Sequence, residues 1–189
     1  MVELLASIEN SGFATWLREA NTVLAYPTVL AMHTFGMAFL VGPNAAIDLR
    51  ILGIAAGLPL GPMERFFRLM WLGFWLNAAS GVVLLSLTPL TFLTTPVFYI
   101  KLAAIAAAVV NLRLLRSRVF GNRANLDTRP VPMEGKILAG TSLTFWTVAI
   151  FAGRVTAYKG FIQRQTALAL LIAIAMVLLA RTIAPRVRS

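Results

Sequence analysis

The chain of 189 residues contains no cysteine and a single histidine, His33. The absence of cysteine excludes disulfide bonds, thiolate metal sites and the covalent attachment of a c-type haem. One histidine cannot build a closed zinc site within one chain, and a haem held by two histidines would need a second protomer or another subunit. The sequence also has no arrangement typical of a nucleophile with its base, and no phosphate-binding loop.

Charged residues are scarce as well, at 13% of the chain, compared with about 25% in soluble domains. The stretches Ala20–Ile47 and Leu69–Ile100 contain no Asp, Glu, Lys or Arg. Uncharged apolar runs of roughly 18 residues or more are typical of helices that span a bilayer. The sequence therefore predicts an all-α integral membrane helix bundle whose first partner is the lipid bilayer.

The apolar runs and the turns between them predict a single transmembrane domain over residues 1–189 with about five spans. The expected spans are 21–48, 68–87, 97–115, 137–158 and 165–181. Residues 1–19 carry acids and no basic n-region, so we expect no cleavable signal. Their apolar residues recur at helical spacing with a break at Asn10-Ser11-Gly12, which indicates a short interfacial helical segment anchored by Trp16.

The formal net charge of +10 does not indicate a nucleic-acid partner, because the basic residues cluster at helix ends and in one loop. Most of them fall on one side of a five-span topology. By the positive-inside rule, we expect a multi-pass protein of the bacterial inner (plasma) membrane with its N-terminus outside and its C-terminus cytoplasmic. The residues on the cytoplasmic side are Arg50, Arg65, Arg68, Arg113, Arg116, Arg118, Arg123, Arg129, Lys136, Arg181, Arg186 and Arg188.

Ionisable side chains inside a bilayer cost about 2.5–3.5 kcal/mol each on insertion scales, so each is a candidate for function. His33 shares a helical face with Tyr26, Leu30 and Met37. Histidine is a usual axial ligand of haem b and a common ligand of copper or zinc. The alternative is a neutral histidine that forms a hydrogen bond across a helix interface.

Three further residues are expected in the outer half of the bundle with His33. Lys101 lies about one turn inside the outer end of its span, where it could reach inward or extend to the headgroups. Arg154 and Tyr158 end the span 137–158, and an arginine there could bind a carboxylate or phosphate, or act as an ordinary interface anchor. The candidate cofactor-binding set is Tyr26, His33, Lys101, Arg154 and Tyr158, with His33 as the metal ligand.

Small and polar residues form a stripe on the span 68–87. The stripe consists of Gly73, Asn77 four residues later, Ser80 three residues after that, and the adjacent Gly81. Such stripes are more typical of close helix packing than of a binding site.

The segments "YPTVLAMHTFGMAFLVG", "AIDLRILG", "NAASGVVL", "TPVFYIKLAAIAAAVVN" and "WTVAIFAGRVTAY" resemble a family of small bacterial inner-membrane proteins of unknown function. More distantly, "AMHTFGMAFLVGPNAAIDLRIL" and "FYIKLAAIAAAVV" are similar to the HemJ-type membrane protoporphyrinogen oxidases, a bundle architecture shared with the copper-resistance D proteins. The HemJ resemblance implies haem b binding, with His33 and Lys101 at the required histidine and lysine. The additional fifth helix, the N-terminal segment and "DLR" (Asp48–Arg50) depart from that pattern. The HemJ resemblance therefore does not imply that this protein has enzyme activity.

Three functions follow as hypotheses. The first is a haem b-binding membrane protein with a redox or electron-transfer role, which would be a membrane oxidoreductase if it is an enzyme. The second is a non-catalytic transmembrane subunit of a larger membrane complex, or a homo-oligomer, in which His33 is structural. The third is a small-molecule or metal permease, which is disfavoured because the sequence lacks an acidic site, a methionine cluster in the outer segments and an inverted repeat.

Overall fold

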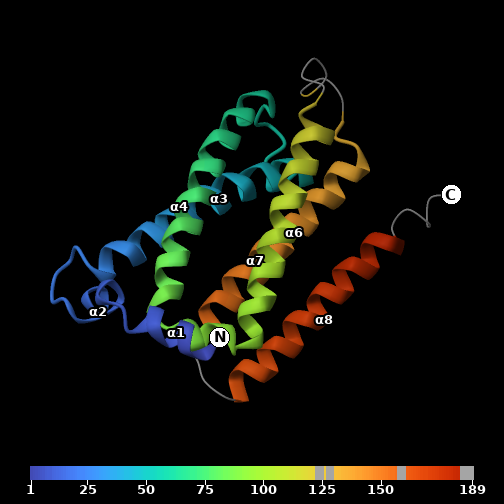
Figure 1. Ribbon diagram of the computed structural model, residues 1–189. Coiled ribbons are helices and arrows are strands. Elements are labelled where there is room, and N and C mark those ends of the chain that lie inside the picture. The colour runs from blue at the N-terminus through green and yellow to red at the C-terminus, as the bar shows by residue number, and fades with distance from the viewer. Residues whose placement is uncertain (122–125, 127–129, 157–160, 184–189) are drawn as a thin grey trace. The chain divides into compact units, whose positions relative to one another are not determined.

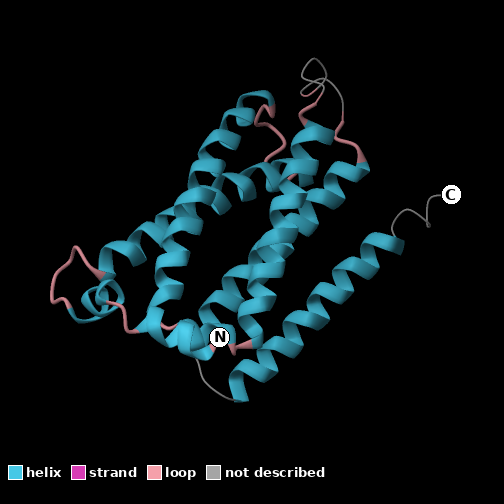
Figure 2. Ribbon diagram, viewed as in Figure 1, coloured by secondary structure: helices cyan, strands magenta, loops and turns pink. Residues whose placement is uncertain are grey.

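The computed structural model describes residues 1–121, 126, 130–156 and 161–183, and all regular secondary structure in this part of the chain is helical (Figures 1 and 2). The predicted all-α class is therefore confirmed. The elements are α1 (Val2–Glu9), α2 (Gly12–Glu19), α3 (Tyr26–Leu52), the 3-10 helix η1 (Gly61–Arg65), α4 (Phe66–Leu87), α5 (Pro89–Leu93), α6 (Pro96–Val119), α7 (Met133–Val155) and α8 (Phe161–Ile183).

Four helical stretches among the described residues are long and apolar enough to cross a membrane. They are Tyr26–Leu52, Gly61–Leu87, Pro96–Val119 and Met133–Val155. The fifth expected span corresponds to α8, in which the apolar stretch Leu168–Leu179 is shorter than a full span. A membrane-embedded helical protein is thus supported, whereas the count of five spans stays a prediction.

The first span begins and ends later than the predicted limits of 21 and 48. It begins at Tyr26 rather than at residue 21, with Pro27 in its first turn, where the missing amide hydrogen costs nothing. It ends at Leu52, and the next residue, Gly53, has a φ of +94°, in the left-handed region that glycine adopts without strain. The amide of Gly53 donates to the carbonyl of Arg50 at 3.1 Å and that of Ile54 to Leu49 at 3.1 Å, which is a Schellman termination.

The connection between the expected spans 68–87 and 97–115 is not a simple loop. Residues Pro89–Leu93 form the short helix α5, which starts with a proline whose fixed φ suits the first turn of a helix. The later helices also extend past the predicted limits, since α6 continues to Val119 and α7 starts at Met133.

The described chain divides into two compact units. Unit 1 comprises Met1–Asn44 and Arg65–Thr95, and unit 2 comprises Ala45–Glu64 and Pro96–Ser189. The division falls within α3, one residue after Pro43. Pro43 has no amide hydrogen to donate to the preceding turn, so the helical hydrogen-bond ladder is interrupted there. The interpretation of the chain as a single domain stays a prediction.

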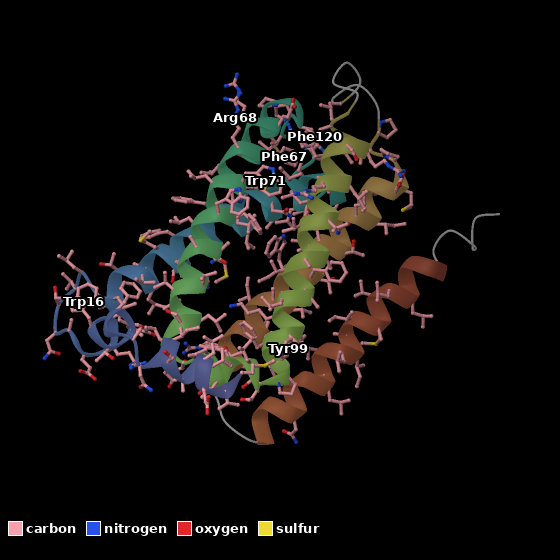
Figure 3. The ribbon with its side chains drawn as sticks, in the orientation of Figure 1. Trp16, Phe67, Arg68, Trp71, Tyr99 and Phe120 are labelled. Carbon is pink, nitrogen blue, oxygen red and sulfur yellow. The ribbon has the colours of Figure 1, made fainter. Side chains whose placement is uncertain are left out.

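In unit 1, the N-terminal helices pack on the end of α4. Ser11 caps α2 by accepting a hydrogen bond from the amide of Ala14 at 3.3 Å, which confirms the predicted break between two helical segments. Ala14 and Leu17 are buried in a small core with Ala25 and Leu87. A neighbouring face of α2 leaves the large apolar side chains of Phe13 and Trp16 exposed (Trp16 is labelled in Figure 3).

Arg18 links α2 to α4, and this bond gives a first prediction. Its Nη1 donates to the carbonyl of Leu87 at 2.7 Å, at the C-terminus of α4, where carbonyls lack helical partners. We expect Arg18→Met to loosen the N-terminal helices and to lower the free energy of unfolding by about 1–2 kcal/mol, the range for a partly exposed charge-assisted hydrogen bond. Faster amide hydrogen exchange over residues 12–19 would show it.

The matched control for Arg18 is Glu19→Gln. Glu19 is the next residue of α2, is exposed, and forms no side-chain hydrogen bond within the described part of the chain. Equal exchange rates in the two variants would mean that the Arg18–Leu87 bond does not hold α2 in place.

Unit 2 is built on the pair α6 and α7, against which α8 packs. The buried face of α6 is rich in small residues, including Ala104 and Ala108, which allow close approach of a neighbouring helix. Asn111 of α6 donates its Nδ2 to the carbonyl of Leu138 and to Oγ1 of Thr141, both at 2.8 Å. Further along, Arg118 and Glu134 form a salt bridge of 2.6 Å in which both side chains are 57% exposed, so it contributes little free energy.

Candidate functional site

His33 lies on α3 in unit 1, about two turns after Tyr26, and is half-buried. Its Nδ1 is 3.0 Å from the backbone carbonyl oxygen of Asn77 and 3.1 Å from Oγ of Ser80, both on α4. A carbonyl oxygen can only accept, so Nδ1 carries the hydrogen and donates it. Ser80 uses its own hydroxyl hydrogen toward the carbonyl of Leu76 at 2.6 Å, so its oxygen is the second acceptor.

This assignment of Nδ1 fixes the tautomer of the imidazole. With the hydrogen on Nδ1, the lone pair of the neutral ring is on Nε2. The bond from Nδ1 to a backbone carbonyl also orients the ring on the surface of α4.

Asn77 completes a reciprocal pair with His33. Its Nδ2 donates to the backbone carbonyl of His33 at 2.7 Å, while its own backbone carbonyl accepts from the His33 ring. Each residue therefore binds the backbone of the other, and α3 and α4 are held in register at this level. Interhelical hydrogen bonds of this kind in membrane proteins contribute about 0.6 kcal/mol on average and up to about 1.7 kcal/mol.

Two glycines bring the backbones of α3 and α4 together next to this pair. A Cβ atom on Gly36 would lie 2.6 Å from the amide nitrogen of Asn77 and 2.9 Å from the carbonyl of Gly73. A Cβ atom on Gly73 would lie 2.7 Å from the carbonyl of Gly36 and 2.7 Å from the amide nitrogen of Leu40. Since these neighbours are backbone atoms, the crossing accepts only glycine at both positions.

Gly81, the second glycine of the stripe on α4, lies under the imidazole ring. A Cβ atom on Gly81 would be 3.2 Å from Cε1 of His33, closer than a side chain normally approaches, and 3.6 Å from Nδ1. The stripe Gly73, Asn77, Ser80 and Gly81 is therefore a packing surface, as the sequence indicated, and also the surface that binds His33. This second role was not predicted from the sequence, although a histidine within an uncharged run was a signal for it.

The other predicted site residues do not all fall in the same unit. Tyr26 is in unit 1, at the first residue of α3, and is 43% exposed. It is seven residues from His33, or about 10 Å along the helix axis. Lys101 and Arg154 are in unit 2, on α6 and α7. Tyr158 lies outside the described residues.

Lys101 lies in the second turn of α6, and its side chain extends over Gly153 near the end of α7. A Cβ atom on Gly153 would be 3.5 Å from Cε of Lys101 and 3.6 Å from Nζ. Arg154, the next residue of α7, is exposed. The structure thus brings Lys101 and Arg154 to one end of unit 2, and it holds His33 with Asn77 and Ser80 in unit 1.

Within residues 1–121, 126, 130–156 and 161–183, no group of three or more His, Cys, Asp or Glu side chains could hold a metal ion. His33 is consequently a candidate for one axial position of a cofactor that brings its own metal, rather than a member of a protein-built metal site.

No protein-family model matches the chain, and no curated protein and no solved structure is similar to it. The resemblances noted from the motifs therefore stay hypotheses, and function has to be inferred from the geometry of the two units.

Proposed function

We propose that the protein binds haem b in the membrane, with Nε2 of His33 as an axial ligand, and serves a redox or electron-transfer role. The observation that carries the proposal is the hydrogen bond from Nδ1 of His33 to the carbonyl of Asn77. Histidines that bind metals almost always donate their other ring nitrogen to a carbonyl, a carboxylate or water, which fixes the tautomer and orients the ring.

The chemistry of the donor set fits haem b at one axial position. A neutral imidazole with its lone pair on Nε2 is the form that binds haem iron, and the bound haem would supply one-electron chemistry. The contribution of this chain is to orient the ring and to pack it closely against α4. Asn77 and Ser80 accept its hydrogen, and Gly81 lets the ring lie against α4.

The proposal depends on His33, Asn77 and Ser80, all in unit 1. Lys101 and Arg154 belong to unit 2, so their expected role in binding the same cofactor is not needed for it. Because the chain has no second histidine and no cysteine, a second strong axial ligand would come from another copy of the chain or from another subunit.

The proposed topology follows the distribution of basic residues. With α8 as a fifth span, the N-terminus is outside and the C-terminus is in the cytoplasm of a bacterial inner (plasma) membrane. The sequence before α7 is rich in arginine, which supports a cytoplasmic location for the N-terminal end of this helix.

A reduced-minus-oxidised spectrum tests the haem proposal. We expect protein purified in mild detergent from haem-supplied cells to show a Soret and an alpha band. His33→Ala should lose at least about 90% of this absorbance, because it removes the proposed axial ligand. The control is Thr34→Ala. Thr34 is the next residue of α3, and its hydroxyl donates to the carbonyl of Leu30 in its own helix at 2.9 Å. A wild-type protein without these bands would refute the proposal.

A second candidate function is a non-catalytic subunit of a membrane complex. The observation in its favour is the reciprocal pair of hydrogen bonds between His33 and Asn77, which by itself gives the histidine a structural role. In this case the wild-type spectrum has no haem bands, His33→Ala lowers only the stability, and a stoichiometric partner is recovered with the protein under mild detergent.

A further inference from the structure

Two basic residues, Lys101 and Arg154, lie at one end of unit 2. Lys101 lies over Gly153, with Nζ 3.6 Å from the position of a Cβ on that glycine. The next residue is Arg154, whose Cα is about 3.8 Å from that of Gly153 across a trans peptide. Lys101, in the second turn of α6, thus lies over the residue that directly precedes Arg154 in the last turn of α7.

Neither side chain has a partner of opposite charge in the described part of the chain. No hydrogen bond or ion pair joins the ammonium of Lys101 or the guanidinium of Arg154 to another described residue. The carboxylate of α7 itself, Glu134, is in its first turn and is bonded to Arg118. It lies 20 residues from Arg154, or about 30 Å along the helix.

The backbone carbonyls at the end of α7 do not need the lysine either. The amide of Thr156 donates to the carbonyl of Ala152 at 3.1 Å, and the Thr156 hydroxyl donates to the carbonyl of Gly153 at 2.6 Å. The last turn of the helix is thus closed by its own capping residue. The lysine is therefore not needed to cap this helix.

The expected depth of these residues in the bilayer indicates which anions could reach them. Lys101 is five residues after the start of α6, or about 7.5 Å along its axis. Tyr99, two residues earlier, is 53% exposed and lies near the same end of α6 (Figure 3). Exposed tyrosines mark the headgroup level of a bilayer, and lysine stems extend toward that level. The anions most concentrated there are lipid phosphates.

From these observations we infer that Lys101 and Arg154 form a binding site for a phosphate group at one end of unit 2. Lysine acts as a point charge, and arginine presents a planar fork that matches two oxygen atoms of one phosphate. The absence of a side chain on Gly153 allows the lysine stem to lie flat on α7 beside the arginine. This site is separate from the histidine in unit 1 and does not depend on the proposed haem.

Thermal unfolding of the full chain in a neutral detergent tests the inference. Phosphatidylglycerol, phosphatidylcholine and inorganic phosphate are added in separate titrations. We expect the wild type to be stabilised, and Lys101→Met and Arg154→Gln each to weaken the apparent affinity for the stabilising phosphate compound about tenfold, as for the loss of one charge-assisted hydrogen bond. Arg118→Gln, at the opposite end of α6, is the control and should bind like the wild type.

The titrations also separate the sources of the phosphate. Stabilisation by phosphatidylglycerol but not by inorganic phosphate identifies a lipid headgroup, whereas equal stabilisation by both identifies a soluble phosphate compound. Lys101→Met removes a charge from a membrane helix and keeps the length of the stem, so it should fold, and Lys101→Arg should retain binding. Unchanged affinity in both Lys101→Met and Arg154→Gln, or an equal loss in Arg118→Gln, would overturn the inference.

Discussion

Replacing Gly73 with alanine is expected to destabilise the pair α3–α4 strongly, because the two helix backbones meet at this glycine. The new Cβ would lie 2.7 Å from the carbonyl of Gly36 and 2.7 Å from the amide nitrogen of Leu40. Both are backbone atoms of a helix, so the contact cannot be relieved by rotating a side chain. Because overpacking with such shifts costs about 1–3 kcal/mol, we expect a loss near the upper end of that range.

Reversible unfolding of the detergent-solubilised protein, followed by circular dichroism with increasing SDS, measures this change. Gly42→Ala is the matched control, since Gly42 lies on α3 and a methyl group there would have no neighbouring atom within 4 Å. The stability of this control should be within about 0.5 kcal/mol of the wild type. Equal stabilities of Gly73→Ala and Gly42→Ala would show that the two backbones do not meet in the membrane as described.

The same substitution also bears on the histidine. Separating α3 from α4 would lengthen the bonds between His33 and Asn77, which at 2.7 and 3.0 Å have little room to stretch. Under the haem proposal, Gly73→Ala should therefore reduce haem content as well as stability. The glycines are in this sense part of the site, although they touch no ligand.

The fold class followed from the sequence because a bilayer imposes a simple rule. A span must satisfy its backbone internally and must be apolar, and long uncharged runs reveal such helices. The N-terminal break was also predictable, because Asn10-Ser11-Gly12 has the residue types that end one helix and cap the next. Helix ends were less predictable. The start of α3 at Tyr26 and the short helix Pro89–Leu93 depend on local hydrogen bonds within apolar sequence.

The candidate site was predictable only in part. His33 and Lys101 stand out in sequence because ionisable groups are rare in spans, but their partners do not. The acceptor for His33 is the backbone carbonyl of Asn77, and a backbone atom has no residue-type signature. The expected cluster of five residues also assumed a common depth in one bundle. Depth along a helix cannot say which residues share a compact unit, and Lys101 and Arg154 belong to the unit without His33.

Asn111→Asp is expected to have the largest effect in unit 2, because it changes the hydrogen-bonding capacity of a buried side chain without changing its shape. Asn111 is 2% exposed and donates two hydrogen bonds of 2.8 Å, to the carbonyl of Leu138 and to Oγ1 of Thr141. An aspartate has no amide hydrogens, so its oxygen would face a carbonyl oxygen. A charged carboxylate in a span adds about 2.5–3.5 kcal/mol on insertion scales.

Asn111→Leu is the informative control, since it removes the same two hydrogen bonds without adding a charge. Neither acceptor depends on the asparagine: Leu138 is inside α7, and the Thr141 hydroxyl also donates to the carbonyl of Ile137 at 2.9 Å. The substitution also removes Oδ1 of Asn111, a buried oxygen with no hydrogen-bond partner among the described residues. We therefore expect a loss of only about 1 kcal/mol for leucine.

The difference between the two variants isolates polarity from packing at the α6–α7 contact. Folding yields and SDS unfolding midpoints should rank the wild type first, Asn111→Leu second and Asn111→Asp last, with about 2 kcal/mol or more between the last two. If aspartate were tolerated as well as leucine, the position would have access to water or to a cation, and the close contact of α6 with α7 at this level would be wrong. A leucine variant as unstable as the aspartate variant would instead assign the stability of this pair to the two hydrogen bonds, beyond what interhelical bonds in membranes usually contribute.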